Sequence, residues 1–361
     1  MNQLKAVRES GQSIWLDFIR RNLITSGQLK QMVADGIHGM TSNPTIFHKA
    51  IAQNNDYDDA ISAILTTEPD IDTQALYERL AVEDIQMTAD ILRPIYEASG
   101  GIDGMVSLEV SPYLAYDTPG TIAEARRLWE LVNRPNLVIK IPATPQGIPA
   151  VETLIGEGIN INITLMFSLK HYEAVSHAYI RGLEKNPDPG RITSVASFFV
   201  SRIDTYVDKE LERIGTEETL ALRGKAAVAS SKIIYQCFKK VFYGEEFAAQ
   251  RRRGARVQRP LWGSTSTKNP AYPDVIYVEN LIGPDTVNTI PPETLEAFCD
   301  HGKTCPTIEE GIAEAEKALA ELKRVGINLG NITEQLQKDG VKAFADSFDQ
   351  LLAALEEKRK G

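Results

Sequence analysis

The sequence of 361 residues is poor in the features that mark several protein classes. It has three cysteines, Cys237, Cys299 and Cys305, and this small and odd number does not indicate a disulfide framework. Acidic residues outnumber basic ones by 49 to 39, and the net charge of −10 disfavours general binding to nucleic acid or to a membrane surface. No apolar run approaches the roughly 18 to 20 residues of a membrane span, and the N-terminus lacks the basic-then-apolar order of a secretory signal. These absences predict a cytoplasmic protein with no nucleic-acid or membrane partner.

The motifs of metal and nucleotide sites are missing as well. The histidines do not have the spacing of zinc ligands, and no cysteine pair substitutes for them. They are His38, His48, His171, His177 and His301. No Walker-type loop is present, and no G-x-G-x-x-G turn follows the first expected strand. We therefore expect a reaction that uses neither a metal ion nor a bound nucleotide.

Short apolar segments alternate with amphipathic helical segments along most of the chain. Hydrophobic residues make up 43% of the sequence and charged residues 24%, as in ordinary globular proteins. Eight strands that alternate with helices predict an α/β fold, a single (β/α)₈ TIM barrel. An open doubly wound sheet is the alternative, but the missing glycine-rich turn disfavours it. The expected strands are residues 13–19, 36–42, 104–110, 137–143, 161–167, 192–199, 259–265 and 274–280.

The chain continues well beyond the last expected strand. Residues 307–325 and 340–361 have amphipathic patterns, so we expect a C-terminal helical extension over about 291–361 that packs on the barrel. No linker or repeat divides the sequence, which predicts one domain over residues 1–361. Whether the C-terminal helices cover the barrel mouth or its side stays open. The basic run at residues 251–259 is expected to be a solvated loop at the N-terminal rim, with a partner or anion site as the alternative.

Polar residues stand in or just after nearly every expected strand. In TIM barrels, catalytic groups project from the carboxyl ends of the strands and from the loops that follow them. A carboxylate pair, an amine, two further cations and several hydroxyl and amide groups are therefore candidates for one site. They are Asp17, Asn43, Glu109, Lys140, Asn162, Thr164, Ser197, Arg202, Ser264, Ser266 and Lys268.

Lys140 lies in the middle of an apolar segment, NLVIKIPATPQG, between Ile139 and Ile141. Burial of a charge is costly unless it is compensated, and burial favours the neutral form of an amine. A neutral amine attacks carbonyl carbon and forms Schiff bases. The alternative is a lysine that extends to the rim of the barrel or pairs with a carboxylate for stability alone.

The other candidates have structural alternatives too. Asp17 or Glu109 could simply balance the charge of Lys140, and Asn43 could cap a helix that begins at Pro44. Three strand residues could satisfy backbone groups, and two cations could be ordinary surface charges. These are Asn162, Thr164 and Ser197, and Arg202 and Lys268, respectively.

Six motifs, in order along the chain, carry a specific family resemblance. They are MTSNPTIF (40–47), VSLEVSP (106–112), VIKIPAT (138–144), INITLMFS (161–168), ASFFVSRID (196–204) and WGSTSTKNP (262–270). In these motifs, and over nearly its whole length, the chain resembles the transaldolases of the class I Schiff-base aldolase superfamily, in particular their longer bacterial-type subgroup. The resemblance implies reversible transfer of a dihydroxyacetone unit in the pentose phosphate pathway. The donor is sedoheptulose 7-phosphate or fructose 6-phosphate, the acceptor is glyceraldehyde 3-phosphate or erythrose 4-phosphate, and no metal or organic cofactor takes part.

The resemblance also implies a role for each candidate. Lys140 matches the Schiff-base lysine, and Asp17 matches the carboxylate that moves a hydroxyl proton during carbon–carbon cleavage. Glu109 and Thr164 match the pair that holds and activates a water. The contacts to the dihydroxyacetone moiety fall on Asn43, Asn162 and Ser197. Those to the phosphate fall on Arg202, Ser266 and Lys268, where Lys268 replaces a common arginine.

Two other activities remain as alternatives to this one. Fructose 6-phosphate aldolases share the lysine and the barrel, but they are much shorter and typically carry Gln and Tyr where this chain has Glu109 and Phe199. Both positions follow the transaldolases, and Phe199 joins the expected substrate site. A barrel that binds sugar phosphates without catalysis would be expected to lack Lys140 or a carboxylate. The expected partners are small sugar phosphates, and the sequence does not decide between a monomer and a homodimer.

Overall fold

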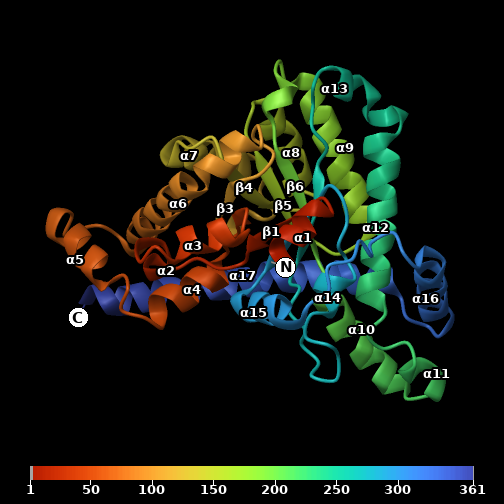
Figure 1. The fold of residues 1–361 in the computed structure, drawn as a ribbon. Coiled ribbons are helices and arrows are strands. Elements are labelled where there is room, and N and C mark those ends of the chain that lie inside the picture. Colours follow the sequence, from red (N-terminus) through yellow and green to blue (C-terminus); the bar gives the residue numbers. More distant parts are fainter. Residues whose placement is uncertain (1–2, 361) are drawn as a thin grey trace.

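The computed structural model describes residues 3–360 and contains a closed barrel of eight parallel strands (Figure 1). Each strand pairs with the next one along the chain, and the last pairs with the first. This confirms the expected (β/α)₈ fold, while residues 1, 2 and 361 of the expected domain lie outside the described part. The strands are β1 (Gln12–Leu16), β2 (Gly39–Met40), β3 (Met105–Glu109), β4 (Leu137–Pro142), β5 (Ile161–Met166), β6 (Ser194–Phe199), β7 (Arg259–Gly263) and β8 (Thr286–Ile290).

Helices surround the strands and extend beyond the barrel (Figure 1). They are α1 (Gln3–Glu9), α2 (Arg21–Thr25), α3 (Gln28–Asp35), α4 (Pro44–Ala52), α5 (Asp58–Thr67), α6 (Thr73–Ala98), α7 (Thr118–Val132), α8 (Gly147–Gly156), α9 (Leu169–Lys185), α10 (Ser201–Ile214), α11 (Glu217–Leu220), α12 (Ala226–Tyr243), α13 (Ala248–Arg252), α14 (Ile276–Glu279), α15 (Pro292–His301), α16 (Ile312–Arg324) and α17 (Leu329–Lys360). Short 3₁₀ helices are η1 (Pro112–Leu114), η2 (Pro189–Arg191) and η3 (Glu245–Phe247). Within residues 3–360, no helix combines the length and the hydrophobicity that crossing a membrane requires.

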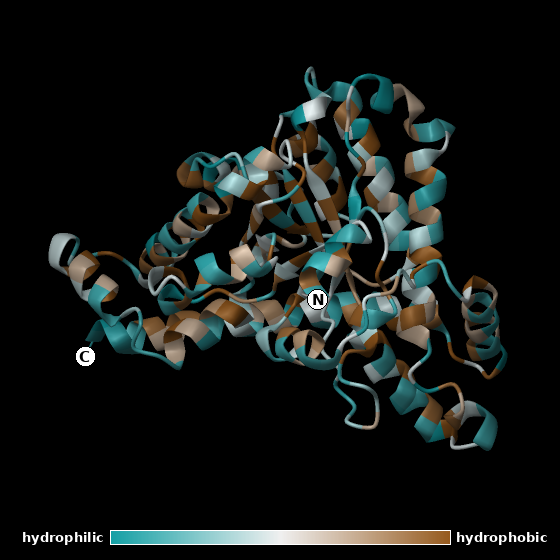
Figure 2. Cartoon of the chain, in the orientation of Figure 1, coloured by the Kyte–Doolittle hydropathy of each residue, from teal (hydrophilic) through white to brown (hydrophobic). Residues whose placement is uncertain are grey.

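The barrel interior is filled in layers. Hydrophobic residues concentrate in the strands, as Figure 2 shows, and one buried cluster takes side chains from six of them. Its members are Trp15, Met105, Val138, Val195, Leu261 and Val287. Because side chains alternate between the two faces of a strand, the residues two positions further along also face the interior. Those residues are Asp17, Ser107, Lys140, Ser197, Gly263 and Thr289, so a largely polar layer follows the apolar one.

The eighth strand lies elsewhere than the sequence predicted. Residues 274–280 contain the short helix α14 and not a strand, and β8 is Thr286–Ile290. In α14, Tyr277 is buried and its hydroxyl donates a hydrogen bond of 2.8 Å to Asp204 on α10. The prediction of a strand at 274–280 is therefore wrong, and the barrel strands end at residue 290. The helical extension then begins directly with α15.

The basic run at residues 251–259 is solvated, as predicted, only in its first half: residues 251–254 are exposed, whereas residues 255–259 are buried or half-buried. The guanidinium group of Arg253 donates to a backbone carbonyl oxygen in the last turn of α9, and that of Arg256 donates to two carbonyl oxygens in the turn after α6. Arg259 is buried in β7, with Nη2 3.5 Å from Oδ1 of Asp103. Burial opposes ionisation of Asp103, but the charge of Arg259 and hydrogen bonds from neighbouring side chains lower its pKa overall. The run therefore stabilises the end of the barrel that β7 enters.

Helix α17 lies across the carboxyl ends of the strands, which answers the question that the sequence left open. The side-chain amide of Gln337 donates to the carbonyl oxygens of Ala143 (2.9 Å) and Leu165 (3.0 Å), which follow β4 and end β5. Further along α17, Ser347 accepts a hydrogen bond of 2.8 Å from Thr45 on α4. Figure 1 shows α17 as the long blue helix that passes along this end of the barrel. The C-terminal helix thus covers part of the barrel mouth.

Candidate active site

One cavity at the carboxyl ends of the strands gathers most of the expected site residues. Its volume is about 450 Å³, and it occupies the face on which TIM barrels place their active sites. Its walls include Asp17, Asn43, Lys140, Ser197, Phe199, Arg202, Ser266 and Lys268. The remaining expected residues lie beside Lys140 in the barrel. Glu109 and Asn162 align with it on β3 and β5, and Thr164 aligns with Pro142.

Lys140 is buried at the inner wall of this cavity, and its side chain does not extend to the rim. The residue is only 4% exposed. Its Nζ donates a 3.2 Å hydrogen bond to the carbonyl oxygen of Ser42 and lies 3.6 Å from Oε2 of Glu109. The ring of Phe344, from α17, covers it with a centroid 5.8 Å from Nζ. An amine in these surroundings is screened from bulk water on several sides.

Glu109 and Thr164 supply polar atoms close to the amine. Burial raises the pKa of the Glu109 carboxyl to about 7; the positive charge of Lys140 opposes this rise, and the negative charge of Asp17 adds to it. Among residues 3–360, neither Oε2 of Glu109 nor Oγ1 of Thr164 has a hydrogen-bond partner, although both atoms are buried. A carboxyl with a pKa near 7 can both give and accept a proton at neutral pH.

Asp17 approaches the cavity from the end of β1. The hydroxyl of Thr41 donates a hydrogen bond of 2.7 Å to its Oδ1, and that hydroxyl lies 2.6 Å from the hydroxyl of Thr289. Burial raises the pKa of Asp17 overall, and the charge of Lys140 and the hydrogen bond from Thr41 offset only part of that rise. These contacts fix the orientation of the carboxylate and favour its ionised form against the effect of burial.

Asn162 and Ser197 belong to a buried network that starts beside Lys140. The hydroxyl of Ser197 donates to Oδ1 of Asn162 (2.6 Å), and Nδ2 of Asn162 donates to Oγ of Ser107 (3.0 Å). Ser42, whose carbonyl accepts from Lys140, donates its own hydroxyl to the carbonyl oxygen of Ser107 (2.7 Å). Asn162 and Ser197 therefore bond to other side chains and do not merely satisfy backbone groups. Asn43 does cap a helix as expected, since its Oδ1 accepts from the amide of Ile46 (3.0 Å).

Positive charges gather at one side of the cavity. Arg202 stacks against Phe199, with Cζ 5.2 Å from the ring centroid, and makes no hydrogen bond or ion pair within residues 3–360. Nζ of Lys268 donates to Oγ of Ser266 (2.6 Å). Burial lowers the pKa of Arg202 and that of Lys268, so both groups would gain from an anion that compensates their charge.

Lys49 and Phe344 also line the cavity, although the sequence did not single them out. Lys49 stands on α4 six residues after Asn43, and Ile46 between them lines the cavity as well. This three-residue spacing places all of them on one helix face and was a usable signal. Phe344 had no such signal, because its position depends on how α17 crosses the barrel.

The sequence is similar to those of known proteins whose family fits this site. The sequence model of the family described as Transaldolase/Fructose-6-phosphate aldolase matches residues 14–355. The chain belongs to this family. A protein named transaldolase from Thiobacillus denitrificans (strain ATCC 25259 / T1) is 49% identical over 360 residues, which cover 98% of this chain and 100% of the relative.

Two further relatives show similar agreement over the full length. A transaldolase from Thermobifida fusca (strain YX) is 45% identical, with 97% of this chain and 96% of the relative covered. A protein named transaldolase 2 from Nostoc sp. (strain PCC 7120 / SAG 25.82 / UTEX 2576) is 46% identical, with 100% and 98% covered. The family match extends from β1 into α17. The family's sequence model therefore covers most of α17.

The hydrogen bonds of Gln337 should be important for the covering helix. We expect Gln337→Ala to lower the free energy of unfolding by about 1–3 kcal/mol, because two buried carbonyl oxygens lose their shared donor. The matched control is Gln335→Ala on the same helix, where the exposed side chain bonds only to Asp339; its effect should stay within about 0.5 kcal/mol. Urea unfolding of both variants measures the difference. Equal stabilities of the two variants would contradict the assigned role.

Proposed function

We propose that this protein is a transaldolase that transfers a dihydroxyacetone unit between sugar phosphates through a Schiff base on Lys140. One observation carries the proposal: the buried amine of Lys140 lies 3.6 Å from a carboxyl whose pKa is about 7. Lys140 stands at the inner wall of a cavity that is lined elsewhere by cations, and Glu109 lies beside it in the barrel. A nucleophile, a proton exchanger and an anion site are the groups that transfer between phosphorylated carbonyl compounds requires.

The reaction would begin with attack of the neutral Lys140 amine on the C2 carbonyl of a ketose phosphate. The resulting carbinolamine loses its C2 hydroxyl as water to give the iminium. Glu109 donates the proton for this loss through a water held with Thr164. The unpartnered Oε2 of Glu109 and Oγ1 of Thr164 support this role. Asn162 and Ser197 would bond to the hydroxyls of the bound three-carbon unit or hold the neighbourhood of the lysine.

Cleavage then depends on Asp17. Its ionised carboxylate takes the proton of the C4 hydroxyl, the C3–C4 bond breaks, and the iminium nitrogen accepts the electron pair. An aldose phosphate leaves, and the three-carbon enamine stays on Lys140. A second aldose phosphate accepts the enamine carbon while Asp17 returns the proton. Hydrolysis of the new iminium, assisted by Glu109, releases the product.

The cationic side of the cavity would bind the phosphate. Arg202, Ser266 and Lys268 supply donors, and Lys268 acts as a point charge because it lacks the two-pronged geometry of arginine. Asn43 and Phe199 complete the substrate site. Fixing the phosphate holds the reacting carbon next to Lys140.

The finer assignments belong to the same proposal. The donor is sedoheptulose 7-phosphate or fructose 6-phosphate, and the acceptor is glyceraldehyde 3-phosphate or erythrose 4-phosphate. We place the reaction in the pentose phosphate pathway of the cytoplasm, carried out by residues 1–361 as one domain in a monomer or homodimer without a cofactor. Composition and the family resemblance support these assignments.

A transfer assay separates the proposed activity from simple aldol cleavage. With fructose 6-phosphate and erythrose 4-phosphate, we expect steady formation of sedoheptulose 7-phosphate. Without an acceptor, glyceraldehyde 3-phosphate should appear only up to about one equivalent per enzyme, because the three-carbon unit stays on Lys140. Sustained release of free dihydroxyacetone without an acceptor would identify an aldolase instead.

The covalent intermediate can be trapped directly. Borohydride added together with fructose 6-phosphate should reduce the Schiff base, and peptide mapping should locate a three-carbon adduct on Lys140. Lys140→Arg keeps a cation beside Glu109 and should form no adduct while remaining folded. An adduct on another lysine, or none in the native protein, would refute the mechanism.

The phosphate site predicts selectivity that can be measured in one half-reaction. In ping-pong kinetics, kcat/KM for the acceptor reports only the second half-reaction. Arg202→Gln should lower it by about 10- to 100-fold for erythrose 4-phosphate, because a charged hydrogen bond contributes about 1.5–3 kcal/mol. For unphosphorylated erythrose the value should hardly change. The control is Arg213→Gln at the exposed end of the same helix. An equal loss with both acceptors would mean that Arg202 does not bind the phosphate.

A further inference from the structure

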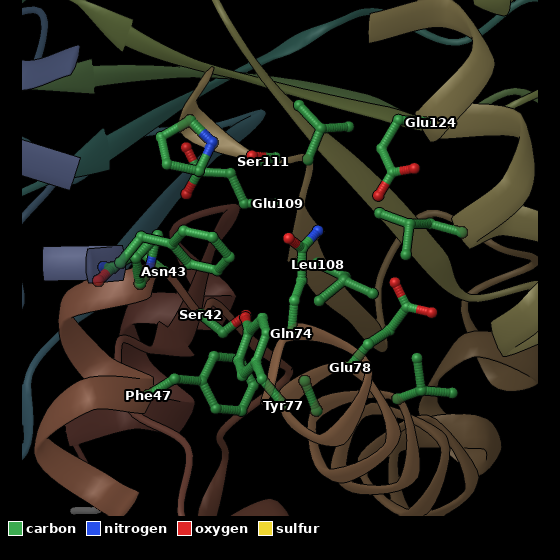
Figure 3. A pocket seen from close by; sticks show the side chains of 17 residues that line it. Ser42, Asn43, Phe47, Gln74, Tyr77, Glu78, Leu108, Glu109, Ser111 and Glu124 are labelled. Carbon is green, nitrogen blue, oxygen red and sulfur yellow. The ribbon is translucent and has the colours of Figure 1, made fainter. Parts of the chain in front are cut away.

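A second, smaller cavity reaches Glu109 through the wall of the barrel (Figure 3). It lies among α4, α6, α7 and β3, and its volume is about 40 Å³. The two cavities share Asn43 in their walls, but Glu109 lines only the small one and Lys140 only the large one. Figure 3 shows Glu109 on one side of the small cavity and Glu78 and Glu124 on the other, with the amide of Gln74 between them in this view.

We propose that this side cavity is the route by which water reaches and leaves Glu109 while a sugar phosphate occupies the main cavity. The route rests on the imine chemistry of the proposed function. Each iminium that forms releases one water, and each iminium that is hydrolysed consumes one. A substrate bound through its phosphate, under α17, closes the main entrance to that water during the covalent stage.

The inner end of the route holds groups that interact with water. Oε2 of Glu109 is buried without a hydrogen-bond partner among residues 3–360. Burial raises the pKa of the Tyr77 phenol, which is also in the cavity wall, and the negative charges of Glu109 and Glu78 add to that rise. The edge-on contacts of its ring with Phe47 and Phe348 fix its position. Polar groups thus occur along the wall from the inner end towards the outer end.

The outer end is polar and partly open to solvent. Glu78 on α6 and Glu124 on α7 are 27% and 22% exposed, and both form ion pairs with Arg127. Arg127 is itself 46% exposed. Arg127 donates two hydrogen bonds to each of these carboxylates, and because all three side chains are partly exposed, the outer end of the cavity is in contact with solvent. It can therefore admit water.

The size of the cavity suits a short file of water molecules and excludes substrate. A water needs roughly 10–15 Å³ of such space together with a few polar partners, so the side cavity of about 40 Å³ accommodates about three or four waters. A sugar phosphate does not fit into this volume. A simple packing gap would be expected to be lined by apolar groups alone, whereas this cavity has carboxyl groups at both ends.

The test compares two rates in the half-reaction with fructose 6-phosphate in ¹⁸O-labelled water. One is the rate of iminium formation, from borohydride quenching at successive times. The other is the rate at which label enters C2 of the recovered sugar. A defect in catalysis lowers both rates together. A blocked water route lowers only the labelling, because the released water stays in place and returns to the same carbon.

Ala81→Val narrows the cavity from α6, and Val82→Ile is a milder second variant; both residues line it and are buried. We expect Ala81→Val to lower labelling per iminium formed by about tenfold, since the remaining space falls below the roughly 10–15 Å³ that a water needs. Val82→Ile should lower it less. The matched control is Ala89→Val, a buried position on the same helix that does not line the cavity. Lys140→Arg supplies the background exchange of the free sugar.

The outcomes separate the route from the mechanism on which it rests. An unchanged ratio in both cavity variants, or an equal fall in Ala89→Val, would overturn the side route and leave the Schiff base intact. Absence of any trapped adduct in the native protein would overturn the proposed function first. If Ala81→Val does not fold, the ratio in Val82→Ile decides the question alone.

Discussion

The burial of one amine is the constraint on which the rest of the site depends. Lys140 stands in the interior of a barrel, next to a buried cluster of apolar side chains from six strands, where an uncompensated cation would be very costly. The carboxyl of Glu109 and the carbonyl of Ser42 compensate it, and the same burial raises the pKa of Glu109 to about 7. A carboxyl with a pKa near 7 can give or accept a proton at neutral pH. Burial is thus the common origin of the energetic cost of the Lys140 charge and of the raised pKa of Glu109.

The closed barrel solves the geometric part of the problem. Parallel strands in a fixed register bring Glu109, Lys140 and Asn162 side by side, although the chain separates them widely. Side-chain alternation then places a polar residue two positions beyond most of the apolar interior residues, as in Val138 and Lys140. A slip of one residue would turn Lys140 outward, so packing of the apolar layer and orientation of the reactive group are enforced together.

The sequence indicated most of this because both regularities are local. Seven of the expected strands and the polar groups after them could be located from short apolar runs. The eighth could not, because DVIYVEN looks more like a strand than TVNTI does. Tyr277 is buried where α14 contacts α10 and its hydroxyl bonds to Asp204, a contact that is distant in the sequence. The threonines and the asparagine of β8 face polar groups of the interior or of neighbouring loops, so this strand lacks the apolar pattern that marks the others. Phe344 was missed for a similar reason: only the path of α17 over the barrel brings it to Lys140.

A covalent enamine places opposite demands on water. The enamine carbon must be kept from water until the acceptor aldehyde arrives, since a proton from solvent would end the transfer, whereas the iminium must gain and lose water at C2 in every cycle. In a single cavity these demands conflict, because the opening that admits water to C2 also admits it to the enamine. The proposed access through the barrel wall would remove the conflict: Glu109 would control the water at C2 from one side, while α17, Phe344 and a bound phosphate would close the other. On this view the position of Glu109, in the wall of the small cavity but within reach of the amine, is what allows group transfer to prevail over hydrolysis.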